Sequence, residues 1–131
     1  MARPRNFEEA TVIAQAATVF GQLGYNAASI DDLVKATGLL RGSLYKAFGS
    51  KHHLFERVLA QALQAGWPAR EEAVDLLIIA LKELAPSDAA ITEQCRAAVQ
   101  ETGADTARLL GERLLSHLNH PSKETPCPPS N

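Results

Sequence analysis

The 131-residue sequence predicts an all-α protein, with a three-helix domain followed by a small helical module. Apolar residues recur at the three- and four-residue spacing of amphipathic helices through most of the chain. Glycine or proline interrupts this periodicity at intervals, at Gly24, Gly38, Gly66 and Pro86. Capping residues stand where several of the periodic segments begin. Together these observations predict short helices joined by tight turns.

The expected elements follow from these signals in order. They are Phe7 to Gln22, a second helix from Ser29 to Thr37, a third from about Leu40, a fourth from Ser50 to about Ala65, a fifth from Ala69 to Leu84 and a sixth from Ala89 to about Leu118. Ser29 with Asp32 predicts a capping box at the second helix, and Gly38 supplies the left-handed turn that ends it. A short helix, a glycine turn and a second helix form the helix-turn-helix plan. Within the sixth helix, Gly103 is expected to bend or split the chain at a cost of about 1 kcal/mol relative to alanine.

The fifth expected helix is apolar on nearly all sides between Leu76 and Leu81. A helix of this kind is normally buried on several faces. Because few helices are left to cover it, the pattern predicts a second copy of the chain as its cover, with two helices from each copy forming a four-helix interface. The residues predicted to make that dimer interface are Leu77, Leu81, Ile91, Cys95, Ala98 and Leu109.

Charge is distributed unevenly along the chain. The net charge is −2, but residues 1–57 have a balance of +2 and residues 58–131 a balance of −4. From Leu33 to Phe55 there is no Asp or Glu, while four cations occur there: Lys35, Arg41, Lys46 and Lys51. A helix-turn-helix whose surface carries one sign of charge is typical of a protein that contacts the phosphate backbone. The sequence therefore predicts double-stranded DNA as a partner.

Other classes of function find little support. Two cysteines at a wide spacing predict neither a zinc site nor a disulfide framework. Adjacent His52 and His53 diverge on a helix, so no metal and no cofactor are expected. No nucleophile, base and acid combination indicates an enzyme. The sequence shows no secretory signal and no apolar run near the ~20 residues of a membrane span, so a cytoplasmic location is expected.

A set of spaced motifs within residues 7–60 is specific. These are Gly24-Tyr25, then Ala28-Ser29-Ile30 with Leu33, then Gly38, then Gly42-Ser43-Leu44-Tyr45 with Phe48, and then Ser50-Lys51 with Leu54. In this combination the chain resembles the tetracycline-repressor (TetR) family of bacterial regulators. The resemblance implies a three-helix DNA-binding domain with its helix-turn-helix in residues 1–50, a helical dimerisation and regulatory module in residues 51–118, and a tail in residues 119–131 that is expected to be disordered.

The resemblance also implies site residues. It places DNA contacts at Arg41, Gly42, Ser43, Tyr45 and Lys51, and the sequence adds Lys46 on the outward side of the same helix and Ser29 at the start of the helix before it. Arg41 is expected to approach bases and Gly42 to allow close backbone approach, while Ser43, Tyr45 and Lys51 are expected at phosphates. A half-buried core position is the alternative for Tyr45. Leu40 departs from the family pattern, which commonly has a Ser or Thr cap there.

The same resemblance implies a homodimeric transcriptional regulator, usually a repressor, that binds a palindromic operator. A small hydrophobic effector is a further expected partner, although the module after the fourth helix is much shorter than the family usually has. The alternative is a truncated interaction module that pairs with a longer regulator and modulates it.

Overall fold

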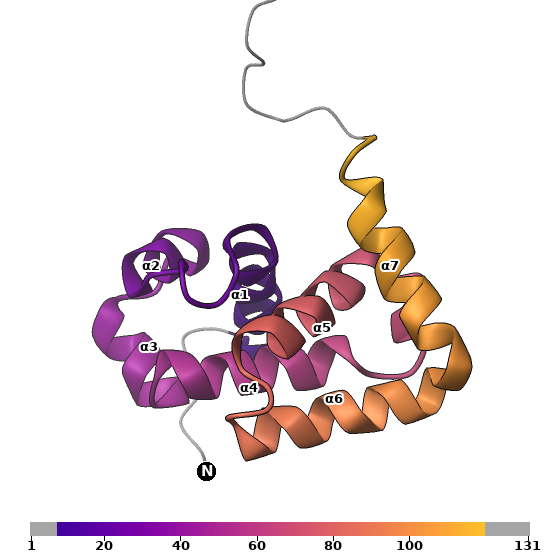
Figure 1. Cartoon of the computed structure of the whole chain (residues 1–131). Coiled ribbons are helices and arrows are strands. Elements are labelled where there is room, and N and C mark those ends of the chain that lie inside the picture. Colours follow the sequence, from indigo (N-terminus) through magenta and orange to yellow (C-terminus); the bar gives the residue numbers. More distant parts are fainter. Residues whose placement is uncertain (1–7, 120–131) are drawn as a thin grey trace, which may run out of the picture.

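The computed structural model describes residues 8–119, which form seven α-helices and contain no strand (Figure 1). The helices are α1 (Glu9–Leu23), α2 (Ile30–Thr37), α3 (Arg41–Phe48), α4 (Lys51–Ala62), α5 (Glu71–Glu83), α6 (Ala89–Thr102) and α7 (Thr106–Ser116), with 3₁₀ turns at Trp67–Ala69 and Gly103–Asp105. The predicted all-α class is therefore confirmed. No helix within the described range is long and apolar enough to cross a membrane. The tail predicted for residues 119–131 lies, apart from Asn119, outside the described residues.

The helix ends of the first domain form where local sequence places them. Ser29 and Asp32 make the predicted capping box, in which each side chain accepts a hydrogen bond from the other residue's backbone N–H, at 3.0 and 2.9 Å. Gly38 ends α2 with φ of +76°, a conformation that side chains other than glycine rarely adopt. Ser50 accepts a hydrogen bond from the backbone N–H of His53 and so caps α4. The interval between α2 and α3 is consequently short and sharply turned.

One hydrophobic core extends across the predicted domain boundary. Helix α1 packs against α2 and α4, and it also packs against α5 of the following module. Phe20, Tyr25 and Phe55 form an aromatic cluster in this region, with ring centroids 5.0 to 5.9 Å apart. The core then continues without a break through α5 into α6. The division at residues 50 and 51 stays a prediction, but the packing on its two sides is shared.

The apolar fifth helix does not need a second chain for its burial. Leu76, Leu77 and Ala80 are all 0% exposed within a single protomer. The cover comes from α1 and α4 as well as from α6 and α7. The expectation that a partner chain must cover this helix was wrong, because the sequence did not reveal that α1 and α4 of the first domain lie against it.

The predicted sixth helix is divided at Gly103, where φ is +60°. After the 3₁₀ turn, α7 runs at an angle to α6 and leaves the body of the molecule, at the end opposite α2 and α3 (Figure 1). Arg113 fixes α7 to α5 by donating two hydrogen bonds to the carboxylate of Asp75, at 2.8 and 3.0 Å. The ion pair raises the pKa of Arg113, which remains charged. The split expected at Gly103 is therefore observed.

Candidate nucleic-acid interface

Helix α3 has one face in the core and one face in solvent. Leu44 and Phe48 point inward and are only 4% and 7% exposed. Arg41, Gly42, Tyr45 and Lys46 lie on the exposed side, and these four residues are called the α3 face below. Ser43 is half-buried at the edge of this face.

Arg41 is held by a neighbour that the sequence did not single out. Its guanidinium donates a hydrogen bond to the carboxylate of Asp31 in the first turn of α2. The two side chains are 54% and 73% exposed, and exposed ion pairs typically contribute only about 0–1 kcal/mol. A base edge or phosphate could therefore replace Asp31 at small cost. When no such ligand is bound, the ion pair with Asp31 orients the Arg41 side chain at the start of α3.

Tyr45 and Lys46 extend the α3 face along the helix. Tyr45 is 43% exposed, which argues against a core role for its ring. Among residues 8–119, no hydrogen bond or ion pair of Lys46 is found. A free ammonium and a solvent-facing hydroxyl are groups that commonly donate to phosphate oxygens.

No contact within the described part of the protein requires a glycine at position 42. Gly42 lies in α3 with ordinary helical geometry, and a Cβ added to it would meet no atom within 4 Å. Glycine within a helix costs up to about 1 kcal/mol relative to alanine. The residue therefore reduces the stability of α3 while leaving open space on its outer surface. Such space suits close approach of another molecule to the backbone.

The open surface at Gly42 can be tested by substitution. Replacing Gly42 with alanine should raise the free energy of unfolding by up to about 1 kcal/mol, since the helix gains a better former and nothing clashes. DNA affinity should fall in the same variant, because the methyl group occupies the approach surface. Urea denaturation and a fluorescence-anisotropy titration with operator DNA would measure the two changes. A variant that gains stability and keeps full affinity would contradict close approach at this position.

Lys51 is placed differently from what the resemblance implies. Its ammonium donates hydrogen bonds to the backbone carbonyls of Tyr25 and Ala28, at 2.9 and 3.0 Å, and lies 4.4 Å from the centre of the Tyr25 ring. Burial of that ring raises the pKa of Tyr25, which keeps its hydroxyl protonated. Two of the three N–H groups of Lys51 thus fix the loop between α1 and α2. A phosphate contact through the third stays a prediction.

Ser29 and Leu40 are the N-cap residues of α2 and α3, the two helices of the helix-turn-helix. The side chain of Ser29 is engaged in the capping box, and the backbone N–H of Ser29 is the main cause of a lowered pKa of Asp32. Leu40 stands at the N-cap of α3, is 76% exposed and makes no capping hydrogen bond. A Ser, Thr, Asp or Asn cap typically contributes about 1 kcal/mol, so α3 begins less firmly than α2. This agrees with the departure noted from the sequence.

The predicted dimerisation residues divide into two groups. Leu77, Ile91, Cys95 and Ala98 are 0 to 4% exposed within one protomer. This corrects the prediction for these four, because they fill the protomer's own core and present no surface to a partner. Burial also raises the pKa of the Cys95 thiol to about 11. Leu81 is 37% exposed and Leu109 is half-buried, so these two remain candidates.

Comparison with known proteins places the interface in a family. The model for bacterial regulatory proteins of the tetR family matches residues 12–58, which span α1 to the middle of α4. The match covers less than half of the chain, and it identifies residues 12–58 as a domain of the tetR regulator type. The resemblance seen in the spaced motifs is therefore confirmed. TetR-family proteins are regulators and not enzymes, which agrees with the class expected from the sequence.

Three curated relatives share this part of the chain. They are the HTH-type transcriptional regulator YezE of Bacillus subtilis, described as uncharacterized (42% identical over 55 residues), and the HTH-type transcriptional repressors BdcR (44% over 57 residues) and ComR (42% over 57 residues) of Escherichia coli. The matched segment is 42 to 44% of this chain but only 27 to 29% of each relative. The chain thus matches less than a third of the length of these relatives.

A solved structure shows a weaker likeness. The TetR-family regulator PfmR of Thermus thermophilus has a TM-score of 0.44 and 22% sequence identity, over 88% of this chain and 84% of its own. A score at this level does not establish that the helices of the two chains are arranged alike.

Proposed function

We propose that this protein is a DNA-binding transcriptional regulator that acts as a homodimer on a palindromic operator, and that its usual effect is repression. The observation that carries the proposal is the α3 face. Its cations and its glycine are exposed, and the opposite side of the same helix is anchored in the core. The family match and the relatives named as repressors support the same assignment.

The chemistry of the α3 face fits a major groove. A guanidinium can donate two hydrogen bonds to a guanine edge, and a good bidentate pair discriminates against the wrong base by about 1–3 kcal/mol. Arg41, at the N-terminal end of α3, would read a base edge in this way, since the first residues of a recognition helix point into the groove. Tyr45 and Lys46 would contact phosphates, which fix orientation but carry no sequence information.

A second copy is part of the proposal because one short helix reads only a few base pairs. Two recognition helices on a two-fold axis read half-sites about one turn of DNA apart. One surface that could pair is at and just after α7, where large apolar side chains are exposed: Leu114 (49%), Leu115 (63%) and Leu118 (81%). Leu81 (37%) lies apart from these three, in the groove between α5 and α6. We assign the dimer contact to the surface at α7 in place of the buried residues on α5 and α6.

Control by a small hydrophobic effector has limited room in the groove that residues 8–119 offer between α5 and α6. An apolar groove lies between α5 and α6 and is lined by Leu81, Ala85, Thr92, Cys95 and Val99, among others, with a volume of about 250 Å³. Sites for drug-sized ligands usually start at about 300 Å³. An effector bound within one protomer would therefore be small. A cytoplasmic location, where the operator would be, belongs to the same proposal.

Selection of bound sequences from random DNA tests the proposal directly. The wild-type chain should enrich a two-fold symmetric site, and light scattering should show a dimer. Arg41→Ala should lose preference at one base pair of each half-site, with about 1–3 kcal/mol less discrimination there. Arg96→Ala removes an exposed arginine from α6 and serves as the matched control, with the motif unchanged.

Two results would count against the proposal. Failure to enrich any sequence would contradict sequence-specific binding. A monomer that enriches only a single half-site would contradict the homodimer, and it would favour the alternative in which this chain pairs with a longer regulator.

A further inference from the structure

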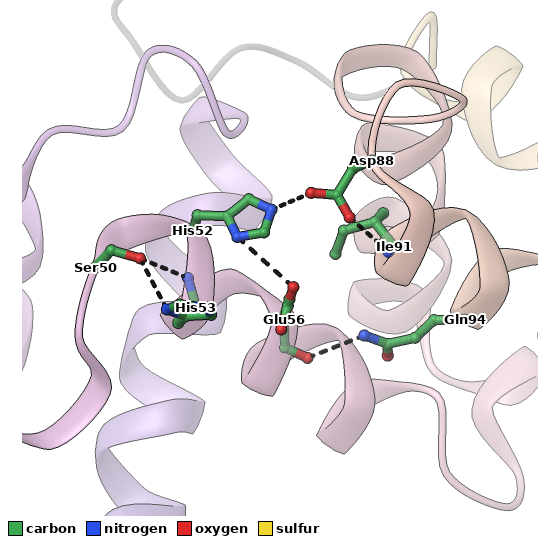
Figure 2. Close-up of polar contacts among 7 residues, drawn as sticks. All are labelled: Ser50, His52, His53, Glu56, Asp88, Ile91 and Gln94. Atoms are coloured by element: carbon green, nitrogen blue, oxygen red, sulfur yellow. Dashed lines mark hydrogen bonds and ion pairs between the residues drawn. The ribbon is translucent and has the colours of Figure 1, made fainter.

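Three side chains with metal-binding groups meet between α4 and the start of α6 (Figure 2). His52 and Glu56 are one helical turn apart on α4, so they share a face of that helix. Asp88 is the N-cap of α6 and comes from a distant part of the sequence. Tertiary packing, and not sequence spacing, brings the third group to the first two. The three are called the His52 cluster below.

The geometry of the His52 cluster is compact. Nδ1 of His52 lies 3.6 Å from an Oε of Glu56, and Nε2 of His52 contacts a carboxylate oxygen of Asp88. One donor atom from each residue can be chosen so that all three lie within 4.8 Å of one another. The side chains of His52, Glu56 and Asp88 are 34%, 27% and 20% exposed, so the cluster is partly shielded but reachable from solvent.

We propose that the His52 cluster binds a divalent first-row transition-metal ion of the zinc class, with one imidazole nitrogen and two carboxylate oxygens as protein ligands. Imidazole and carboxylate are ordinary ligands of such ions, at about 2.0–2.2 Å. Three protein ligands leave a coordination position for water. Two carboxylates and a neutral imidazole carry a net charge of −2, which a divalent ion neutralises.

The capping role of Asp88 uses only one of its two carboxylate oxygens. One carboxylate oxygen of Asp88 caps α6 by accepting the backbone N–H of Ile91 at 2.8 Å, and the other oxygen faces His52 (Figure 2). The hydrogen bond from Ile91 is the main cause of a lowered pKa of Asp88, so that carboxylate is ionised at neutral pH. His52 lies between the two carboxylates, and metal binding requires its ring to turn until one nitrogen faces both. A side chain that is one-third exposed has the space for this movement.

Metal binding here would tighten the joint between the two parts of the chain. Only two residues separate the end of α3 from the start of α4. The joint between α4 and α6 already has a hydrogen bond from the side chain of Gln94 to the backbone carbonyl of Glu56, at 3.3 Å. An ion held by His52, Glu56 and Asp88 adds a second, stronger link. The position of α4, and through it of the α3 face, would then depend on metal.

A zinc competition titration of the full chain tests the proposal. Zn²⁺ is added at neutral pH in the presence of a chromogenic chelator, and one ion should bind per wild-type chain. His52→Ala and Glu56→Gln should each weaken binding by more than about 100-fold, since even changes outside the ligand set cost 10–100-fold. Asp88→Asn should also weaken binding while it keeps the helix cap, because asparagine caps as well as aspartate.

Matched controls separate the cluster from general binding. His53→Ala removes the neighbouring imidazole, which contacts Ser50 and lies outside the cluster (Figure 2). Glu93→Gln removes an exposed carboxylate from α6. Both should retain the wild-type affinity, and Zn²⁺ should raise the thermal midpoint of both but not of His52→Ala. Circular dichroism establishes that each variant is folded.

The proposal is overturned if the folded wild type binds no Zn²⁺, or if His52→Ala binds it as tightly as His53→Ala. The first result would leave the His52 cluster as a contact between an imidazole and two carboxylates that holds no metal. The second would place the zinc on other residues of the chain.

Discussion

Replacing Trp67 with alanine is expected to lower the free energy of unfolding by about 3–5 kcal/mol, the usual range for truncating a buried aromatic side chain. Trp67 is 0% exposed and lies in the 3₁₀ turn between α4 and α5. It belongs to the core that runs from α1 through α5 into α6. A cavity there would remove packing from the core that the two predicted domains share. Urea denaturation followed by circular dichroism at 222 nm would measure the change.

The same variant tests whether the two parts of the chain unfold together. Because the core is continuous, we expect one transition that moves as a whole to lower urea, with loss of DNA binding along that transition. Trp67→Phe is the matched control and should cost much less, since the indole Nε1 has no hydrogen-bond partner to lose. Two separate transitions in Trp67→Ala, with residues 1–50 still folded in the first plateau, would support independent domains instead.

Replacing Lys51 with methionine is expected to lower the free energy of unfolding by about 2–3 kcal/mol. The side chain keeps a similar length, but the carbonyls of Tyr25 and Ala28 lose a charged donor. Hydrogen bonds to charged groups typically contribute about 1.5–3 kcal/mol, and a partly buried carbonyl left unpaired is costly. The loop between α1 and α2 positions α2, and α2 positions α3. DNA affinity should therefore also fall, because α2 and α3 would no longer be held in the arrangement that binds DNA.

Lys46→Met is expected to weaken DNA binding with little change in stability, and it serves as the control for Lys51→Met. Lys46 is exposed on the α3 face, so its removal should change stability by no more than about 0.5 kcal/mol. It should instead weaken DNA binding and reduce the salt slope by about 0.9 for each phosphate that the variant no longer neutralises. Anisotropy titrations over a range of salt concentrations separate the two variants. If Lys51→Met leaves stability unchanged and flattens the slope as Lys46→Met does, Lys51 is a phosphate ligand and not a loop anchor.

Local signals in the sequence determined the helix ends and the outward face of the recognition helix. The Ser29–Asp32 capping box, the left-handed Gly38 and the Ser50 cap each depend on hydrogen bonds or dihedral angles within about four residues. Inward Leu44 and Phe48 leave the α3 face exposed by helical periodicity alone. The family motifs also lie within residues 12–58, where the family model matches. These signals are local, so the sequence reveals them without any knowledge of how the helices pack.

Only the tertiary structure decided which distant residues meet. The carbonyl partners of Lys51 precede it by 26 and 23 residues, and Asp88 follows His52 by 36. No periodic pattern predicts these contacts, because they depend on the angles at which helices pack and on where loops return. The burial of α5 was misassigned to a partner chain for the same reason. An apolar helix face predicts that the helix is buried, but it does not identify what covers it. Only three-dimensional packing determines whether the cover is α1 and α4 of the same chain or a second copy of the chain.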